Sequence, residues 1–208
     1  MSDWLRCSRQ GYVMLTLIRI TLFLAASLLA ACLPVTSRTP VGSTAGFRTD
    51  PSLLGTWKAQ VPAGPPAYLH ILGGEDGTMT AILVNPPHAE DLGDWTTYTL
   101  RAVTLGANHL LNAQETLTNG EASDGPLAEE HVVLLCLEKG TNQITLYQMD
   151  DQAVAAAIRA GEIAGVAEPG KEGDVRITAG EPALDAFMKT SRAAKLFSKE
   201  LVTLTRVQ

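Results

Sequence analysis

Polar and apolar side chains alternate along TTYTLRAVTL, residues 96–105. Successive side chains of an extended strand point to opposite faces of a sheet, so the alternation predicts a half-buried β-strand. One face of this strand carries Tyr98, Leu100 and Ala102, and the other carries Thr97, Thr99 and Arg101. A strand of this kind indicates a sheet that closes over an apolar core.

Further short strands lie on both sides of this stretch and are separated by turn signals. They are expected at residues 54–60, 67–72, 78–84, 109–114, 130–138, 142–148 and 201–206. The links include the glycine-rich turn at 73–77 and the Pro86-Pro87 loop, which suit tight hairpins and loops. The pattern predicts one β-rich domain over residues 51–208, an antiparallel β-barrel or sandwich whose last strand pairs near the first.

Helices are expected late in the chain. Residues 132–137 are apolar on both faces, so one face meets the core and a second element must cover the other. Asp150 or Asp151 can cap a helix that runs to about residue 160, and a second helix is expected over about 181–198 with Pro182 in its first turn. A short strand is expected between them at 174–178. The predicted class is α+β, mainly β with two late helices.

Gly55-Thr56-Trp57, at the head of the first expected strand, resembles the Gly-x-Trp signature of lipocalin-like barrels. The resemblance implies that Trp57 plugs one end of a barrel and that a late arginine, here Arg206, lies against it. The family's Thr-Asp-Tyr segment is absent. The alternative is another small β fold in which Trp57 is a core residue.

A barrel interior would offer a ligand cavity, and the sequence indicates which side chains could line it. The candidates are Tyr68, His70, Tyr98, Leu100 and Leu111. His70 and His109 are in phase with their strand neighbours and could meet inside the barrel. The four histidines lie on separate segments without metal-site spacing, so we expect no metal and no cofactor.

Leu29-Ala30-Ala31-Cys32 follows an apolar run and resembles the lipobox of bacterial lipoproteins. The resemblance implies that residues 1–31 are a signal peptide and that Cys32 becomes acylated after cleavage. Arg6, Arg9 and Arg19 supply the basic region, and Met14 is an alternative start. The other reading is an uncleaved anchor helix over residues 12–33, in which Arg19 would lie within the membrane span.

The segment over residues 32–50 is rich in Pro, Gly, Ser and Thr and shows no periodicity, so a flexible tether is expected after the lipidated cysteine. The residue after Cys32 is Leu33 and not Asp. By resemblance to lipoproteins of two-membraned bacteria, this favours the periplasmic face of the outer membrane within the cell envelope.

Charge excludes one class of partner. The chain has 16 basic and 22 acidic side chains; residues 1–31 hold three Arg and one Asp, so the mature part carries a net charge of −8. Nucleic-acid binding calls for basic stripes, so no nucleic-acid partner is expected. Beyond Cys32 only Cys136 remains, in an apolar run, and it is interpreted as a buried structural thiol.

Three functions remain open. The first is a membrane-anchored binding or interaction module that receives a small apolar ligand or an envelope protein. The second is a structural or assembly lipoprotein of an outer-membrane complex. The third is an enzyme with a dispersed site near His88, Glu90 and Asp91, although no catalytic motif is present and no catalytic residue is assigned. The expectation is a protein that is not an enzyme.

Overall fold

The computed structural model describes residues 34–43, 45–60, 65–87, 92–124, 126–138, 141–167 and 175–207. Residues 1–31, expected to be a signal peptide, and Cys32 lie outside these residues. The strands are β1 (Thr36–Ser37), β2 (Gly55–Ala59), β3 (Ala67–Gly73), β4 (Thr78–Asn85), β5 (Asp94–Leu105), β6 (Asn108–Thr118), β7 (Glu121–Ala122), β8 (His131–Glu138), β9 (Gln143–Gln148), β10 (Gly165–Ala167), β11 (Val175–Ile177) and β12 (Lys199–Arg206). The helices are α2 (Pro126–Glu129), α3 (Asp151–Arg159), α4 (Glu181–Met188) and α5 (Ser191–Ala194).

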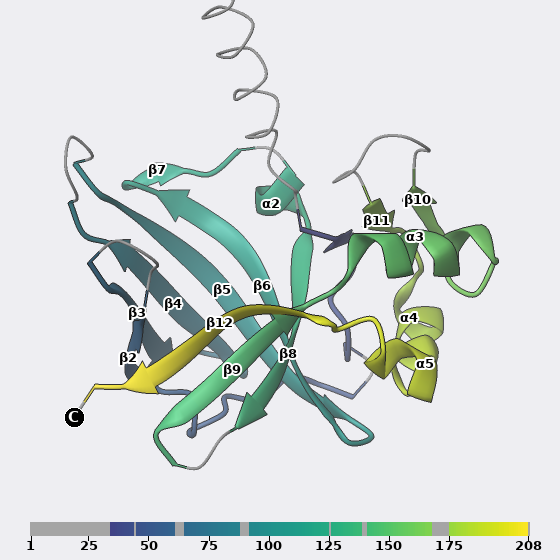
Figure 1. Cartoon of the computed structure of the whole chain (residues 1–208), viewed down its shortest axis with the longest axis horizontal. Helices are drawn as coiled ribbons and strands as arrows, with labels where there is room; N and C mark the ends of the chain where they lie inside the picture. Colours follow the sequence, from purple (N-terminus) through teal and green to yellow (C-terminus); the bar gives the residue numbers. More distant parts are fainter. Residues whose placement is uncertain are drawn as a thin grey trace, which may run out of the picture. The chain divides into compact units, whose positions relative to one another are not determined.

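Eight antiparallel strands close into a barrel in the order β2-β3-β4-β5-β6-β8-β9-β12 (Figure 1). The ring closes because β12 pairs with β2 on one side and with β9 on the other. The pairing of β8 with β6 completes the opposite wall. The prediction of a mainly β, antiparallel barrel is therefore confirmed, and so is the pairing of the last strand near the first.

The barrel interior holds one hydrophobic core, which we call the inner core. It is built from Trp57, Ile71, Met79, Leu100, Leu111 and Leu204 with smaller neighbours, all buried. Leu100 pairs with Met79 and Ala102 pairs with Leu111, which places these inward-facing side chains in cross-strand contact. The inward face expected for residues 96–105 is confirmed.

A second core, which we call the outer core, lies outside one barrel wall. Val103, Leu110, Val133 and Leu135 point outward from β5, β6 and β8 and are buried. They pack with side chains from the late helices, including Val154, Leu184 and Met188. The expected helical cover over residues 132–137 is confirmed: Leu134 and Cys136 belong to the inner core, and Val133 and Leu135 to the outer core.

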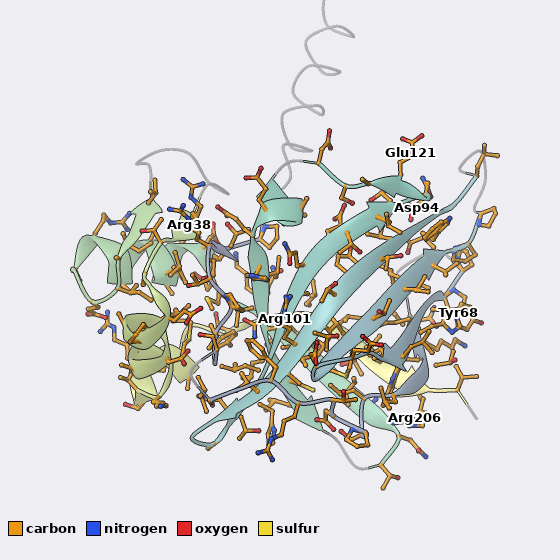
Figure 2. All side chains as sticks on the ribbon, turned by 180° about the vertical axis from the view of Figure 1, so that it is seen from behind. Arg38, Tyr68, Asp94, Arg101, Glu121 and Arg206 are labelled. Atoms are coloured by element: carbon orange, nitrogen blue, oxygen red, sulfur yellow. The ribbon has the colours of Figure 1, made fainter. Side chains whose placement is uncertain are left out.

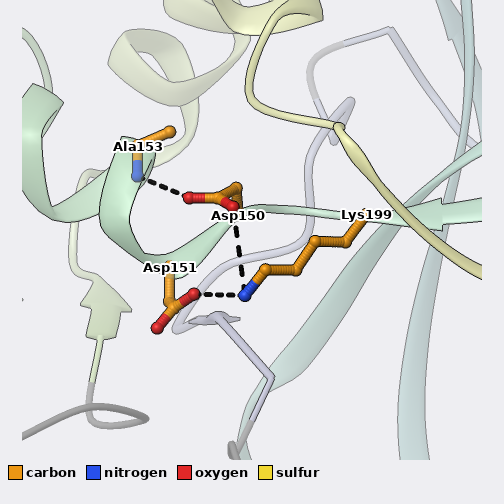
Figure 3. Close-up of polar contacts among 4 residues, drawn as sticks. All are labelled: Asp150, Asp151, Ala153 and Lys199. Atoms are coloured by element: carbon orange, nitrogen blue, oxygen red, sulfur yellow. Dashed lines mark hydrogen bonds and ion pairs between the residues drawn. The ribbon is translucent and has the colours of Figure 1, made fainter.

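The first residues of α3 are fixed by side chains (Figure 3). Asp150 is the N-cap residue and accepts a hydrogen bond from the backbone N–H of Ala153 at 2.8 Å. Lys199, the first residue of β12, pairs with Asp151 and approaches Asp150 at 3.9 Å. The hydrogen bond from Lys199 lowers the pKa of Asp151. These contacts join α3 to the barrel.

The single helix expected over residues 181–198 is wrong in one respect, since it forms two helices. α4 ends at Met188 and α5 begins at Ser191. The Thr190 hydroxyl donates to the Phe187 carbonyl and accepts from the Ala193 N–H, so it caps α5. A threonine that binds the backbone in this way competes with continuation of the helix.

The flexible tether expected over residues 32–50 is wrong for 34–43 and 45–50, which belong to the fold. Val35 and Val41 are buried in the outer core, and β1 pairs with both β8 and β11. The Asn112 side chain accepts from the Val41 N–H at 2.7 Å and donates to the Val41 carbonyl at 2.9 Å. Outside the two residues of β1, isolated buried side chains and side-chain hydrogen bonds hold this segment, so it has no periodicity that a sequence pattern could reveal.

Candidate functional site

One end of the barrel is closed by Trp57 and Arg206, which we call the end plug. The Arg206 guanidinium lies over the Trp57 ring at 4.1 Å from its centroid, the arrangement that the lipocalin-like resemblance implies. Arg206 also donates to the carbonyls of Leu54, at 2.6 Å, and Ser52. The Trp57 indole N–H donates to the Leu53 carbonyl at 2.7 Å. The plug therefore ties the last barrel strand to the segment before the first.

Gly55 is required by this plug. Its φ is +121°, a value that favours glycine, and a Cβ atom there would lie 2.9 Å from an Arg206 guanidinium nitrogen. A side chain at this position would displace the arginine from the Trp57 ring. The glycine of the Gly-x-Trp pattern thus has a local physical reason in this chain.

A cavity of about 390 Å³, which we call the end cavity, lies beside the plug. Its buried lining comes from both cores. The inner core contributes Leu53, Ala102, Leu111 and Cys136, and the outer core contributes Val103 and Leu110. Residues 45–46 and 48–51 form one side, and Thr104 and His109 extend the inner faces of β5 and β6 beyond the barrel. The volume falls within the range of about 300–1,000 Å³ typical of small-molecule pockets.

The rim of the end cavity is polar. Arg48 and His109 are exposed there, and His109 Nδ1 lies 3.1 Å from the Thr104 hydroxyl. Asp50 accepts hydrogen bonds from the backbone N–H and the hydroxyl of Ser52. A buried apolar base below a mixed-charge rim suits a ligand with an apolar body and a polar end.

The five candidate ligand-binding residues do not form one site. Tyr98, Leu100 and Leu111 face the barrel interior, and of these Leu111 lines the end cavity. Burial and the nearby negative charge of Glu115 raise the pKa of Tyr98.

Tyr68 and His70 are corrections, because both point away from the interior. Tyr68 pairs with Lys58, and His70 pairs with Thr56 and lies 3.1 Å from its hydroxyl. Trp57 lies between Thr56 and Lys58 on β2 and faces inward. Thr56 and Lys58 therefore face outward, and so do the residues paired with them on β3. The Tyr68 side chain can be followed at the outside of the barrel in Figure 2.

The suggested meeting of His70 and His109 inside the barrel is also wrong. His70 lies on the outer face of β3, whereas His109 lies at the rim of the end cavity. His88, Glu90 and Asp91 lie outside the described residues. Within the described ranges, no group of three His, Cys, Asp or Glu side chains could hold a metal ion.

A second polar group lies beside β1, whose Thr36 and Ser37 pair with Val132 and His131 of β8. Glu130 accepts from the Thr36 hydroxyl at 2.5 Å and from the Arg176 guanidinium at 3.0 Å. Among the described residues, His131 Nδ1 and one Arg101 guanidinium nitrogen are buried without a hydrogen-bond partner. Burial, followed by the charge of Arg101, lowers the pKa of His131, and Glu130 opposes this shift. This group lies beside β1 and away from the end cavity.

Sequence reasoning missed Arg48, Thr49 and Asp50, because they belong to the segment expected to be a tether. No residue pattern signals their role. They reach the cavity because Arg48 forms an isolated bridge with Ala102 of β5. Cys136, predicted to be buried, is buried and lines the cavity base.

No helix within the described ranges is long and apolar enough to span a bilayer. Comparison of the chain with protein-family models, curated proteins and solved structures gave no match.

Proposed function

We propose that this chain is a bacterial envelope lipoprotein that binds a small ligand in the end cavity. Acyl chains on Cys32 hold it at the periplasmic face of the outer membrane, and it performs no catalysis. The end cavity carries the proposal, because its volume and its apolar base below a polar rim suit a small amphiphilic molecule. The lipobox-like residues Leu29 to Cys32 support the proposed localisation in the cell envelope.

The anchor is tested by Cys32→Ser. This variant is expected to lose incorporation of radiolabelled palmitate and to leave the membrane fraction, because two or more acyl chains are needed for stable anchoring. Cys136→Ser, which keeps Cys32, is the matched control and should label like the wild type. Equal labelling of the Cys32→Ser variant would remove the anchor from the proposal.

Ligand binding is tested with a fluorescent neutral probe, N-phenyl-1-naphthylamine. Thr104→Trp places a large side chain at the exposed rim of the end cavity and is expected to weaken probe binding by about tenfold or more. Thr141→Trp, at an exposed position before β9 that does not line this cavity, is the matched control and should bind like the wild type. Equal affinity in all three proteins would exclude the end cavity as the binding site.

A second function, docking onto another envelope protein, is favoured by one observation. Tyr68, Val84 and Trp95 form a cross-strand row on the outer wall of β3, β4 and β5. The Trp95 side chain is 37% exposed and Leu72 on β3 is 56% exposed. Aromatic side chains are enriched at protein interfaces. Capture of one envelope protein by the wild type, lost in Trp95→Ser, would favour this function.

A further inference from the structure

The folded domain begins almost directly after the cysteine of the proposed anchor. Thr36 and Ser37 are held between β8 and β11, and Val35 is buried in the outer core. Only Leu33 separates Cys32 from Pro34, the first described residue. Two extended residues span at most about 7 Å. An acylated Cys32 would therefore hold Pro34 within about 7 Å, and the start of β1 at Thr36 within about 14 Å, of the lipid anchor.

The surface at this point is the outer face of a small sheet formed by β10, β11 and β1. Thr36 pairs with Arg176, and Arg176 pairs with Val166, so these three residues share one face. Residues 35, 175 and 177 face the other way and belong to the outer core. Arg38 follows Thr36 by two residues, its N–H donates to the Ile177 carbonyl, and it is exposed. Figure 2 shows Arg38 beside this sheet.

The outer face of the small sheet combines positive charge with an exposed apolar side chain. The Arg176 side chain is 50% exposed although it pairs with Glu130, whose carboxylate is nearly buried. Val166 is 41% exposed. Arginines near a membrane surface are attracted to anionic headgroups. The net charge of the mature part is −8, so this cationic face is distinct from the molecule as a whole.

We propose that the outer face of the small sheet rests on the bilayer, with Arg38 and Arg176 against phospholipid headgroups and Val166 at the lipid boundary. This inference depends on the acylated Cys32 of the proposed function. The sequence predicted a domain at the end of a long flexible tether. In this proposal the domain lies on the membrane in a fixed orientation. β3 is four strands from β8 in either direction around the barrel, so Tyr68 and Leu72 on its outer wall point away from the lipid.

The orientation is tested with single fluorophores on the full acylated chain in phosphatidylethanolamine–phosphatidylglycerol vesicles. The lipids carry bromine near the headgroup, and bromine quenches only fluorophores that it contacts. Val166→Cys and Arg38→Cys place the label on the proposed membrane face, and Leu72→Cys places it on β3 as the matched control. Cys136 is buried, so the wild type, treated in the same way, gives the blank.

Loss of fluorescence at residues 166 and 38, with none at 72, would support the orientation. Equal quenching at all three sites, or quenching at 72 alone, would overturn it.

A Gly/Ser linker of about 12 residues between Leu33 and Pro34, which adds a reach of about 20 Å, should reduce quenching at 166. Unchanged quenching with the linker would overturn the role of the short connection. Palmitate incorporation is measured on each sample: an unlabelled chain counts against the proposed function, whereas a labelled chain without the asymmetry counts against this inference alone.

Discussion

The inner and outer cores lie on opposite faces of β5, β6 and β8, and they are held together differently. The inner core is enclosed by the barrel, and each side chain meets partners fixed by the strand register, such as Leu100 with Met79. The outer core is assembled from distant parts of the chain: Val41, Val133, Leu184 and Phe197 all contribute to it. One core follows from a repeating pattern, and the other depends on where separate segments pack.

This difference explains why the N-terminal segment belongs to the fold. The outer wall of β5, β6 and β8 is apolar where Val103, Leu110 and Val133 emerge, and helices alone do not cover it. Residues 35–42 fill the remaining surface, and the Gly42 N–H donates to the buried Asp185 of α4 at 2.6 Å. Because residues 35–42 cover the outer wall of β5, β6 and β8, few residues remain between the folded domain and Cys32.

The largest expected effect is in the inner core. Trp57 is 1% exposed, and Trp57→Ala should lower the free energy of unfolding by about 3–5 kcal/mol, because it removes a buried ring and leaves a cavity. Urea unfolding followed by far-UV circular dichroism measures the change. A near-neutral result would remove Trp57 from the closed end of the barrel.

A smaller but still large effect is expected in the outer core. Leu184 of α4 is fully buried, and Leu184→Ala should cost about 2–4 kcal/mol. Leu201→Ala, at a leucine that is 49% exposed, is the matched control and should change stability by less than about 0.5 kcal/mol. Equal effects of the two variants in the same urea titration would mean that the outer core adds no stability.

The attachment of the N-terminal segment is tested by Asn112→Ala. Asn112 is fully buried, and its removal leaves the N–H and carbonyl of Val41 without partners, at a cost of about 1–3 kcal/mol. Limited proteolysis should then cut within residues 34–50 faster than in the wild type. Asn108→Ala, at the start of the same strand, is the control; the same cutting rate in both variants would contradict the attachment.

The smallest effect concerns pH and the polar group beside β1. The pKa of His131 is lowered in the folded state, so between that value and the ordinary value of 6.5 the unfolded chain binds more protons. The lowered pKa of His131 therefore reduces the free energy of unfolding as the pH falls below about 6.5. Above this pH it has no effect on that free energy. Chemical unfolding at about pH 7 and about pH 5 measures the change. Between these two pH values, the free energy of unfolding should fall less in His131→Gln than in the wild type. An equal fall in the free energy of unfolding in both proteins would contradict the lowered pKa of His131.

Much of the barrel was predictable because its strands alternate. The barrel strands were expected close to their observed bounds, except that β6 continues to Thr118 where the expected strand ended at residue 114. A period of two appears directly in the residue order of strands such as 96–105. The candidate site was less predictable. Tyr68 and His70 were assigned to the interior, although their position beside the inward-facing Leu69 places them outside. A shift of one residue in phase reverses every side chain of a strand.

The order of the residues predicts the antiparallel strands, the two-faced strand at residues 132–137 and a helix cap at Asp150 or Asp151. The lipocalin-like resemblance adds the Trp57–Arg206 pair as a hypothesis. The tertiary structure places residues 34–43 and 45–50 in the fold, separates α4 from α5 and puts the cavity at the plugged end. The place of the N-terminal segment and that of the cavity depend on long-range interactions. Strand alternation and helix caps involve neighbours in sequence, whereas Val41 with Asn112 and Arg48 with Ala102 join segments that no local pattern relates.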